Sequence, residues 1–149
     1  MSGGNALAVS MTLVAGVAGT VQIAVMGRLG ERIGVVPAFA FAAAVAAGFG
    51  ALSLIAARRS FAGYAHAVHQ PWWLWFGGLM GAFVVLTITY AGPRIGTTAT
   101  VAVFLVGQFA AAALVDRYGL FGLDRIAVGW PRMAGLVLLA VGAALTLKK

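Results

Sequence analysis

Residues 97–116 read TTATVAVFLVGQFAAAALVD and decide the fold class of the chain. The first charge in this stretch is Asp116, so residues 97–115 form an uninterrupted uncharged run. An α-helix rises about 1.5 Å per residue, which gives ~28 Å of helix, close to the ~30 Å hydrocarbon core of a bilayer. The stretch therefore predicts a transmembrane helix with one buried amide, Gln108, about 16 Å from its start.

The rest of the chain repeats this pattern. Hydrophobic residues make up 62% of the 149 residues and charged residues 9%, against roughly 45–50% and about 25% in soluble proteins. Long uncharged segments between short charged connections are typical of a polytopic membrane protein. We therefore expect an all-α bundle of five transmembrane helices that forms a single domain over residues 1–149. The expected spans are 6–26, 35–57, 71–91, 97–115 and 131–147.

The fifth span has the weakest support. Between Arg132 and Lys148, only residues 133–147 are uncharged, which corresponds to about 22 Å of helix. The two flanking basic side chains could reach the interface and lengthen the span. If this segment does not cross the membrane, four spans remain.

Glycine is frequent, with 21 positions, and suggests both helix ends and close packing. We expect GRLGERIG at 27–34 and GPRIG at 92–96 to end the first and third helices. Small residues let membrane helices approach closely, and Gly77 and Gly81 have the GxxxG spacing of such contacts. The composition therefore predicts a tight bundle.

The composition also argues against several functions. The net charge of +7 comes from basic residues at the borders of apolar segments, with no basic face, so we expect no nucleic-acid partner. Cysteine is absent, and no phosphate loop or nucleophile motif occurs, so we expect neither an enzyme nor a bound cofactor. His66 and His69 lack a third ligand nearby, so we expect no metal site.

Basic residues divide equally between the two sides that five spans would create, with five on each side. The positive-inside rule derives orientation from an imbalance, and none is present here. We therefore expect insertion in both orientations and an antiparallel homodimer, which would reproduce an inverted repeat. The alternative is that one loop dominates and fixes a single orientation. With four spans the tally becomes seven against three. The N-terminal side carries Arg58, Arg59, Arg117, Arg125 and Arg132, and the opposite side carries Arg28, Arg32, Arg94, Lys148 and Lys149.

Three segments resemble the small YdcZ-type family of the drug/metabolite transporter superfamily. They are VQIAVMGRLGERIGVVPAFAFAAAVAAG at 21–48, WWLWFGGLMGAFVVLTITYAGPRIG at 72–96 and FLVGQFAAAALVDRYGLFGL at 104–123. The resemblance implies a five-helix membrane transporter from a family that includes dual-topology proteins, opposed pairs and fused tandem copies. It also implies that Gln22, Gly107, Gln108 and Asp116 occupy motif positions. Met26 departs from the family pattern, in which Asn often follows the first glutamine by four residues, so a polar contact is missing there.

Gln22 and Gln108 are the only amides inside the expected spans. They have two interpretations: a polar lining for a substrate pathway, or pairing between helices worth about 0.6–2 kcal/mol. The sequence leaves both open. The other candidates for the substrate pathway are Gly107, Thr87, Tyr90 and Trp75.

Trp75 and Thr87 each have a structural alternative. Trp75, with Trp72 and Trp73, fits an interfacial aromatic belt better than a cation–π site, and threonine hydroxyls in helices usually bond their own backbone. Arg28, Arg94 and Asp116 are candidate border charges. We expect Asp116 and Glu31 to be solvated or paired with Arg117, Arg28 or Arg32.

The sequence as a whole favours a multi-pass protein of the bacterial inner membrane that transports a small solute. We expect alternating access at the interface of an antiparallel homodimer, with the bilayer, a second copy and the solute as partners. No Asp or Glu lies inside a span, which argues against proton exchange through a carboxylate in the membrane core. A dual-topology ion channel and a non-transporting scaffold or subunit are the alternatives.

Overall fold

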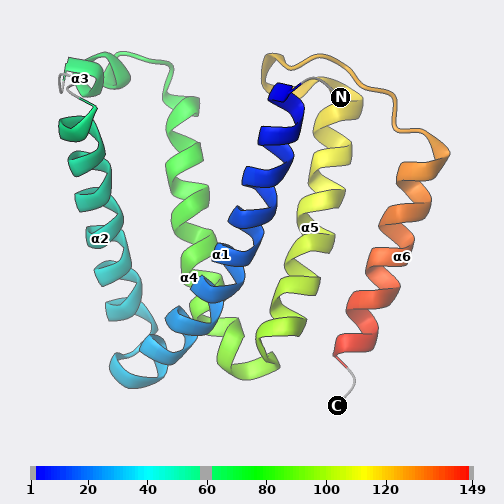
Figure 1. Cartoon of the computed structure of the whole chain (residues 1–149), viewed down its shortest axis with the longest axis horizontal. Helices are drawn as coiled ribbons and strands as arrows, with labels where there is room; N and C mark the ends of the chain where they lie inside the picture. The colour runs from blue at the N-terminus through cyan, green and yellow to red at the C-terminus, as the bar shows by residue number, and fades with distance from the viewer. Residues whose placement is uncertain (1–2, 58–61, 148–149) are drawn as a thin grey trace. The chain divides into compact units, whose positions relative to one another are not determined.

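The structure is a computed structural model that describes residues 3–57 and 62–147 (Figure 1). Its described residues form helices and connections with no strand, as expected for an all-α protein. Arg58, Arg59, Lys148 and Lys149, four of the basic residues in the charge tally, lie outside the described part. The elements are α1 (Gly3–Ile33), α2 (Val35–Ala56), α3 (Ala62–Val68), η1 (Trp72–Trp75), α4 (Phe76–Ile95), α5 (Thr97–Tyr118), η2 (Leu120–Gly122) and α6 (Trp130–Thr146).

Four helical segments are long and apolar enough to cross a membrane. They are Ala6–Ile33, Val35–Ala56, Trp72–Ile95 and Thr97–Tyr118. The fifth apolar helix, α6, has 17 residues, or about 26 Å of helix. The structure thus confirms an all-helical protein with four membrane-capable helices, and the fifth span stays a prediction.

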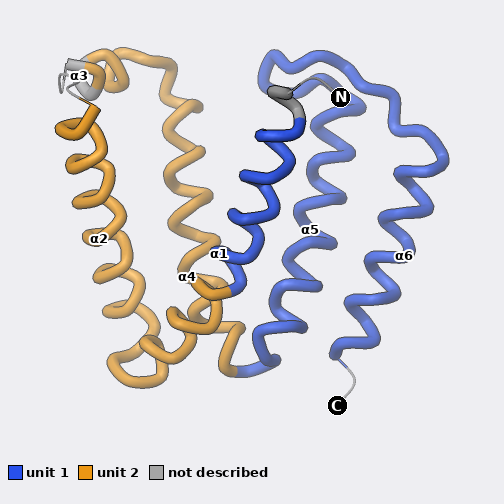
Figure 2. The backbone as a smooth tube through the Cα atoms, in the orientation of Figure 1, with its two compact units in different colours: residues 1–20, 94–149 blue, residues 21–93 orange. Residues whose placement is uncertain are grey.

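The chain divides into two compact units, coloured separately in Figure 2. One unit comprises residues 1–20 and 94–149, so it contains the start of α1 together with α5 and α6. The other comprises residues 21–93, with the end of α1, all of α2 and α3, and nearly all of α4. We refer to them as the outer unit and the inner unit by their place in the sequence.

Glycines bring α1 and α4 together within the inner unit. A Cβ built on Gly30 would lie 2.7 Å from Cγ2 of Thr89, and one on Gly27 would lie 3.0 Å from Cδ of Pro93. From the α4 side, a Cβ on Gly92 would lie 3.3 Å from Cγ2 of Ile23. Only glycine allows backbones to approach this closely, which is the usual means of association between membrane helices.

These contacts accompany a later end of α1 and of α4 than the sequence suggested. The helices do not end at GRLGERIG and GPRIG but continue through them, to Ile33 and Ile95. Most glycines in these stretches serve packing, and only the last one of each ends a helix. Gly34 has φ +91° and ψ 154°, and Gly96 has φ +85° and ψ 154°, so a single residue reverses the chain at each point.

The outer unit is built on the antiparallel pair α5–α6 (Figure 1). Gly119 ends α5 in the left-handed conformation, with φ +60°. Across the connection, the backbone N–H of Ile126 donates to the carbonyl oxygen of Asp116 at 2.8 Å. Arg132 Nη1, in the first turn of α6, also lies 2.8 Å from Asp116 Oδ2. Both contacts tie the start of α6 to the end of α5.

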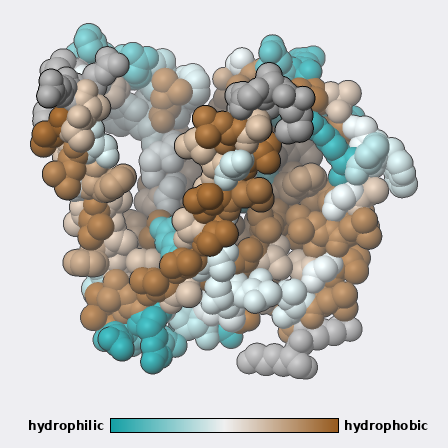
Figure 3. Space-filling model, in the orientation of Figure 1, coloured by the Kyte–Doolittle hydropathy of each residue, from teal (hydrophilic) through white to brown (hydrophobic). Residues whose placement is uncertain are grey.

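Most large apolar side chains face outward. Leu13, Phe49 and Leu138 are 69%, 73% and 72% exposed. Hydrophobic colour covers the helix bodies in Figure 3, and hydrophilic colour gathers at helix ends. Gly77 and Gly81 have no atom within 4 Å of a built Cβ, so the GxxxG pair makes no close contact in the described chain. The expected tight packing is therefore limited to contacts such as those of α1 with α4, and the remaining apolar surface suits lipid or a second protein.

Replacement of Gly96 by alanine should destabilise the protein by about 1–3 kcal/mol, because its backbone conformation is essentially restricted to glycine. No atom lies within 4 Å of the built Cβ, so the effect would be conformational. Gly48→Ala in α2, where a Cβ also meets nothing within 4 Å, is the matched control and should be stabilising by about 0.5–1 kcal/mol. Unfolding in mixed micelles, followed by circular dichroism, measures both. Equal effects of the two substitutions would contradict the assigned turn geometry.

Candidate functional site

The facing sides of α5 and α6 form a seam with a regular spacing of three and four residues. Such spacing keeps side chains on one face of each helix over several turns, as in coiled coils. The α5 side of the seam carries Thr98, Val101, Leu105, Gln108 and Ala112, and the α6 side carries Gly135, Leu139, Gly142 and Thr146.

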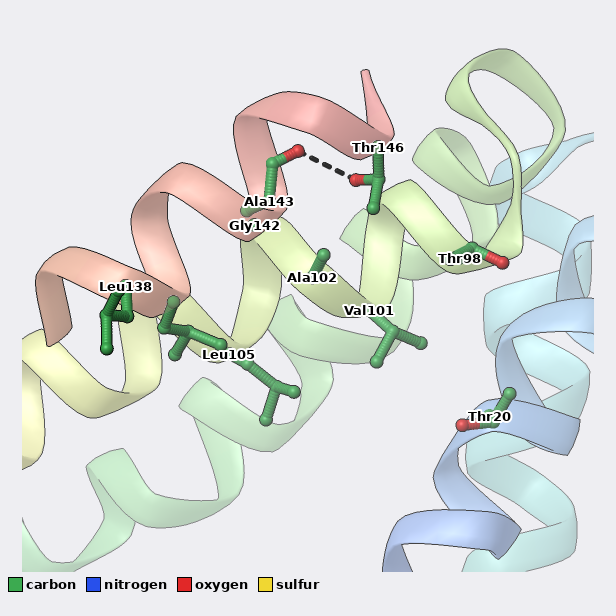
Figure 4. A pocket seen from close by; sticks show the side chains of 10 residues that line it. Thr20, Thr98, Val101, Ala102, Leu105, Leu138, Gly142, Ala143 and Thr146 are labelled. Atoms are coloured by element: carbon green, nitrogen blue, oxygen red, sulfur yellow. Dashed lines mark hydrogen bonds between the residues drawn. The ribbon is translucent and has the colours of Figure 1, made fainter. Parts of the chain in front are cut away.

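Two open grooves lie along this seam and share Leu105 and Leu139 in their walls. The first has a volume of ≈ 480 Å³ and carries a threonine from each of three helices: Thr20 of α1, Thr98 of α5 and Thr146 of α6. Figure 4 shows Thr98 and Thr146 near one end of the α5–α6 pair and Thr20 on the neighbouring helix. The second groove has a volume of ≈ 510 Å³ and contains Gln108. Both grooves are lined mainly by apolar residues, with a few neutral polar groups.

Glycines keep the grooves open. A Cβ built on Gly135 or Gly142 would meet no atom within 4 Å, although each glycine lines a groove. The absent side chains at these two positions of α6 therefore contribute to the open space.

Gln108 lies at the middle of its helix. In α5, 11 residues precede it and 10 follow it. Its side chain is exposed at the surface of the single chain and lines the second groove. Its amide has no hydrogen-bond partner among residues 3–57 and 62–147. Pairing between helices of one chain therefore does not account for Gln108 in the described structure.

Gln22 is in a comparable state within the inner unit. It is exposed on α1, and its amide also has no partner in the described part of the chain. Its neighbour Ile23 is buried against Gly92 of α4, so this turn of α1 is firmly placed. The amides of Gln22 and Gln108 belong to different units of the chain.

The remaining pathway candidates are Gly107 in the outer unit and Thr87, Tyr90 and Trp75 in the inner unit. Gly107 precedes Gln108 and lines neither groove. Thr87 and Tyr90 are exposed in the second half of α4. Trp75 lies before the start of α4, where its Nε1–H donates to the carbonyl oxygen of Ala67 at 3.2 Å. Tyr90 lies 15 residues after Trp75, which places the two residues about 22 Å apart along the helix axis.

The border charges form two ion pairs. Arg28 Nη1 lies 3.0 Å from Glu31 Oε2 within α1, a pairing that the sequence allowed. Asp116 pairs with Arg132 at 2.8 Å, so the expected pair with Arg117 is wrong. Arg94 lies in the last turn of α4.

Sequence reasoning missed the seam and the Asp116–Arg132 pair. The signal for the seam was present in the recurrence of Gly135, Leu139, Gly142 and Thr146 along α6. No signal in the sequence marked the ion pair, because Arg132 lies 16 residues after Asp116 and only the folded connection brings the two together. No cluster of three or more metal-ligating side chains occurs among the residues that the structure describes.

Comparison with known proteins identifies the family. A family described as "Putative inner membrane exporter, YdcZ" matches residues 7–145, which include most of both units and all of the groove-lining residues except Thr146. No curated protein and no solved structure matches the chain.

The Asp116–Arg132 pair should tolerate reversal. Asp116 lies near the negative end of the α5 dipole and Arg132 near the positive end of the α6 dipole, so each charge is at the less favourable terminus. The double variant Asp116→Arg/Arg132→Asp should therefore be as stable as the unaltered protein, or more stable by up to about 1 kcal/mol. Each single reversal should be less stable, because it places like charges together. Unfolding in mixed micelles measures all four proteins, and a double variant as unstable as the single variants would contradict the pairing.

Proposed function

The chain belongs to the YdcZ family of inner membrane exporters, and on this premise we propose that it exports a small solute through the α5–α6 seam of an antiparallel homodimer. It is a multi-pass inner-membrane transporter by family and by the apolar length of its helices. The solute would bind at Gln108 and be exposed alternately to the two sides. The observation that carries this proposal is the free amide of Gln108 in an open groove at the middle of a membrane-length helix.

Lipid gives that amide no hydrogen-bond partner. Leaving an amide unpaired in an apolar medium costs on the order of 2–7 kcal/mol, a large fraction of the roughly 5–15 kcal/mol net stability of most proteins. The groove therefore has to supply a partner from outside the chain: a solute, water admitted with it, or another protein. A pathway that binds a polar solute meets this need.

The position of Gln108 also favours an antiparallel partner. A two-fold axis that inverts a membrane protein lies in the plane of the bilayer, so only groups near the midplane face their own copy across it. Gln108 is at the middle of α5. Two opposed copies packed along the seam would place the two amides together, where each could donate N–H to the carbonyl oxygen of the other. The solute would replace this pairing during transport.

With five spans, the two ends of each chain would lie on opposite sides of the membrane. The short α6 is compatible with this, since Arg132 at its start is 44% exposed and can extend toward the interface. The equal division of basic residues between the two sides supports insertion in both orientations.

Gln108→Leu should reduce transport by at least about tenfold, because it removes the amide that contacts the solute, while Gln108→Asn should retain part of the activity. Gln70→Leu changes an exposed glutamine in the connection before α4 and is the matched control. Gln22→Leu should have a milder effect than Gln108→Leu. Proteoliposomes are loaded with a mixed small-metabolite extract, and mass spectrometry measures the loss of its members from the vesicles.

Dimer content is measured alongside by size-exclusion chromatography with light scattering. Dimeric Gln108→Leu protein without transport supports the pathway. If Gln108→Leu protein is monomeric but any residual dimer transports normally, Gln108 serves assembly only and the proposed pathway is wrong.

A further inference from the structure

We infer that the exported solute is a small organic anion and that the membrane potential drives its export. This inference rests on the proposed function, because it names the charge of the solute that would pass along the α5–α6 seam. Two observations support it: basic side chains are in excess at the helix ends, and the grooves contain hydrogen-bond donors without a partner in the described chain.

The carboxylates of the chain are few, and most are neutralised. Of the three acidic residues, Glu31 is paired with Arg28 at 3.0 Å and Asp116 with Arg132 at 2.8 Å. Asp124 is exposed in the connection between η2 and α6. None of them lies within the middle part of a helix. A cationic solute would therefore meet no carboxylate in either groove.

Basic side chains at the helix ends are in excess. Arg32, Arg117 and Arg125 have no carboxylate within 4.0 Å among the described residues. In an antiparallel dimer, each membrane surface receives the opposite ends of two copies, so each mouth carries the net charge of one whole chain, +7. A surface of one sign raises the local concentration of oppositely charged solutes and repels the others. Both mouths would therefore collect anions.

The free donors in the grooves also suit an anion. Thr20 and Thr146 already donate their hydroxyl hydrogens, to the carbonyl oxygens of Gly16 at 3.1 Å and Ala143 at 2.7 Å. In contrast, Thr98 and the amide of Gln108 have no hydrogen-bond partner in the described part of the chain. Hydrogen bonds to a carboxylate, sulfonate or phosphate oxygen are roughly twice as strong as those between neutral groups. These two donors could thus replace part of the water around an anion.

An anionic solute also provides a driving force for export. The seam has no titratable group through which a proton could be exchanged. An inside-negative potential expels anions without any coupled ion, and 100 mV acting on one charge corresponds to about a 50-fold concentration ratio. A uniporter with positive mouths would therefore suffice for export.

The direct test uses the purified full-length protein in proteoliposomes. The vesicles are loaded with a small-metabolite extract that has been separated by ion exchange into anionic, neutral and cationic pools. Potassium gradients with valinomycin set the potential at inside-negative, zero or inside-positive, and mass spectrometry follows loss relative to protein-free vesicles. We expect loss of members of the anionic pool, fastest at inside-negative potential and slowest at inside-positive potential.

The outcomes separate this inference from the proposed function. Loss from the neutral or cationic pool alone, or loss that does not depend on the sign of the potential, would contradict an anionic solute. The protein would still be a transporter. No loss from any pool would contradict transport itself.

A pair of charge variants of opposite effect provides the second arm. Arg117→Gln removes a positive charge and Asp124→Asn removes a negative charge, both from exposed positions near the same end of the seam. At low ionic strength the first should slow anion loss and the second should accelerate it, each by about threefold. In 0.5 M salt the differences should vanish, because a Debye length of only a few ångströms screens both charges. Identical rates for the two variants at low salt would overturn the role of the positive mouths.

Discussion

Lipid donates and accepts no hydrogen bonds, so each polar group within a membrane-length helix of this chain needs a partner in protein. Thr98 has no partner in the described part of the chain, but other hydroxyl groups find theirs one turn back in their own helix. Six of them donate to the carbonyl oxygen four residues earlier, at 2.7–3.1 Å. These residues are Ser10, Thr12, Thr20, Ser53, Thr89 and Thr100. The amides of Gln22 and Gln108 also have no partner in the described chain, and an amide has more hydrogen-bonding groups to satisfy than a hydroxyl.

In the described chain, few side-chain hydrogen bonds join different helices, so close packing is the main contact between them. In the inner unit, Gly27, Gly30 and Gly92 let α1 and α4 meet beside Thr89 and Pro93. In the outer unit, glycines on α6 have the opposite effect, because Gly135 and Gly142 face open space along the seam. Glycine therefore allows close contact between α1 and α4, whereas between α5 and α6 it leaves open space. This open space forms part of the groove that contains Gln108.

The sequence was sufficient for the helical class and for the four longest apolar helices, since uncharged length alone sets the requirement for crossing a bilayer. It misplaced the ends of α1 and α4, because a glycine that packs against a neighbour looks the same in sequence as one that stops a helix. Gly30 and Gly34 differ only in backbone angles and contacts, which depend on α4. The partner of Asp116 was missed for a similar reason: Arg132 is 16 residues away, and only the folded connection brings it close.

The central claim, that two opposed copies meet along the α5 seam, is tested most directly by disulfide formation between substituted cysteines in a chain that has none. Val101 and Val115 lie seven residues before and after Gln108, on nearly the same helix face. Differently tagged Val101→Cys and Val115→Cys chains are co-expressed and oxidised in membranes. The account predicts bonds between Cys-substituted position 101 of one copy and position 115 of the other, together with self-linking of Gln108→Cys. Bonds of 101 with 101 and of 115 with 115, without the mixed product, would show a parallel pair and contradict the account.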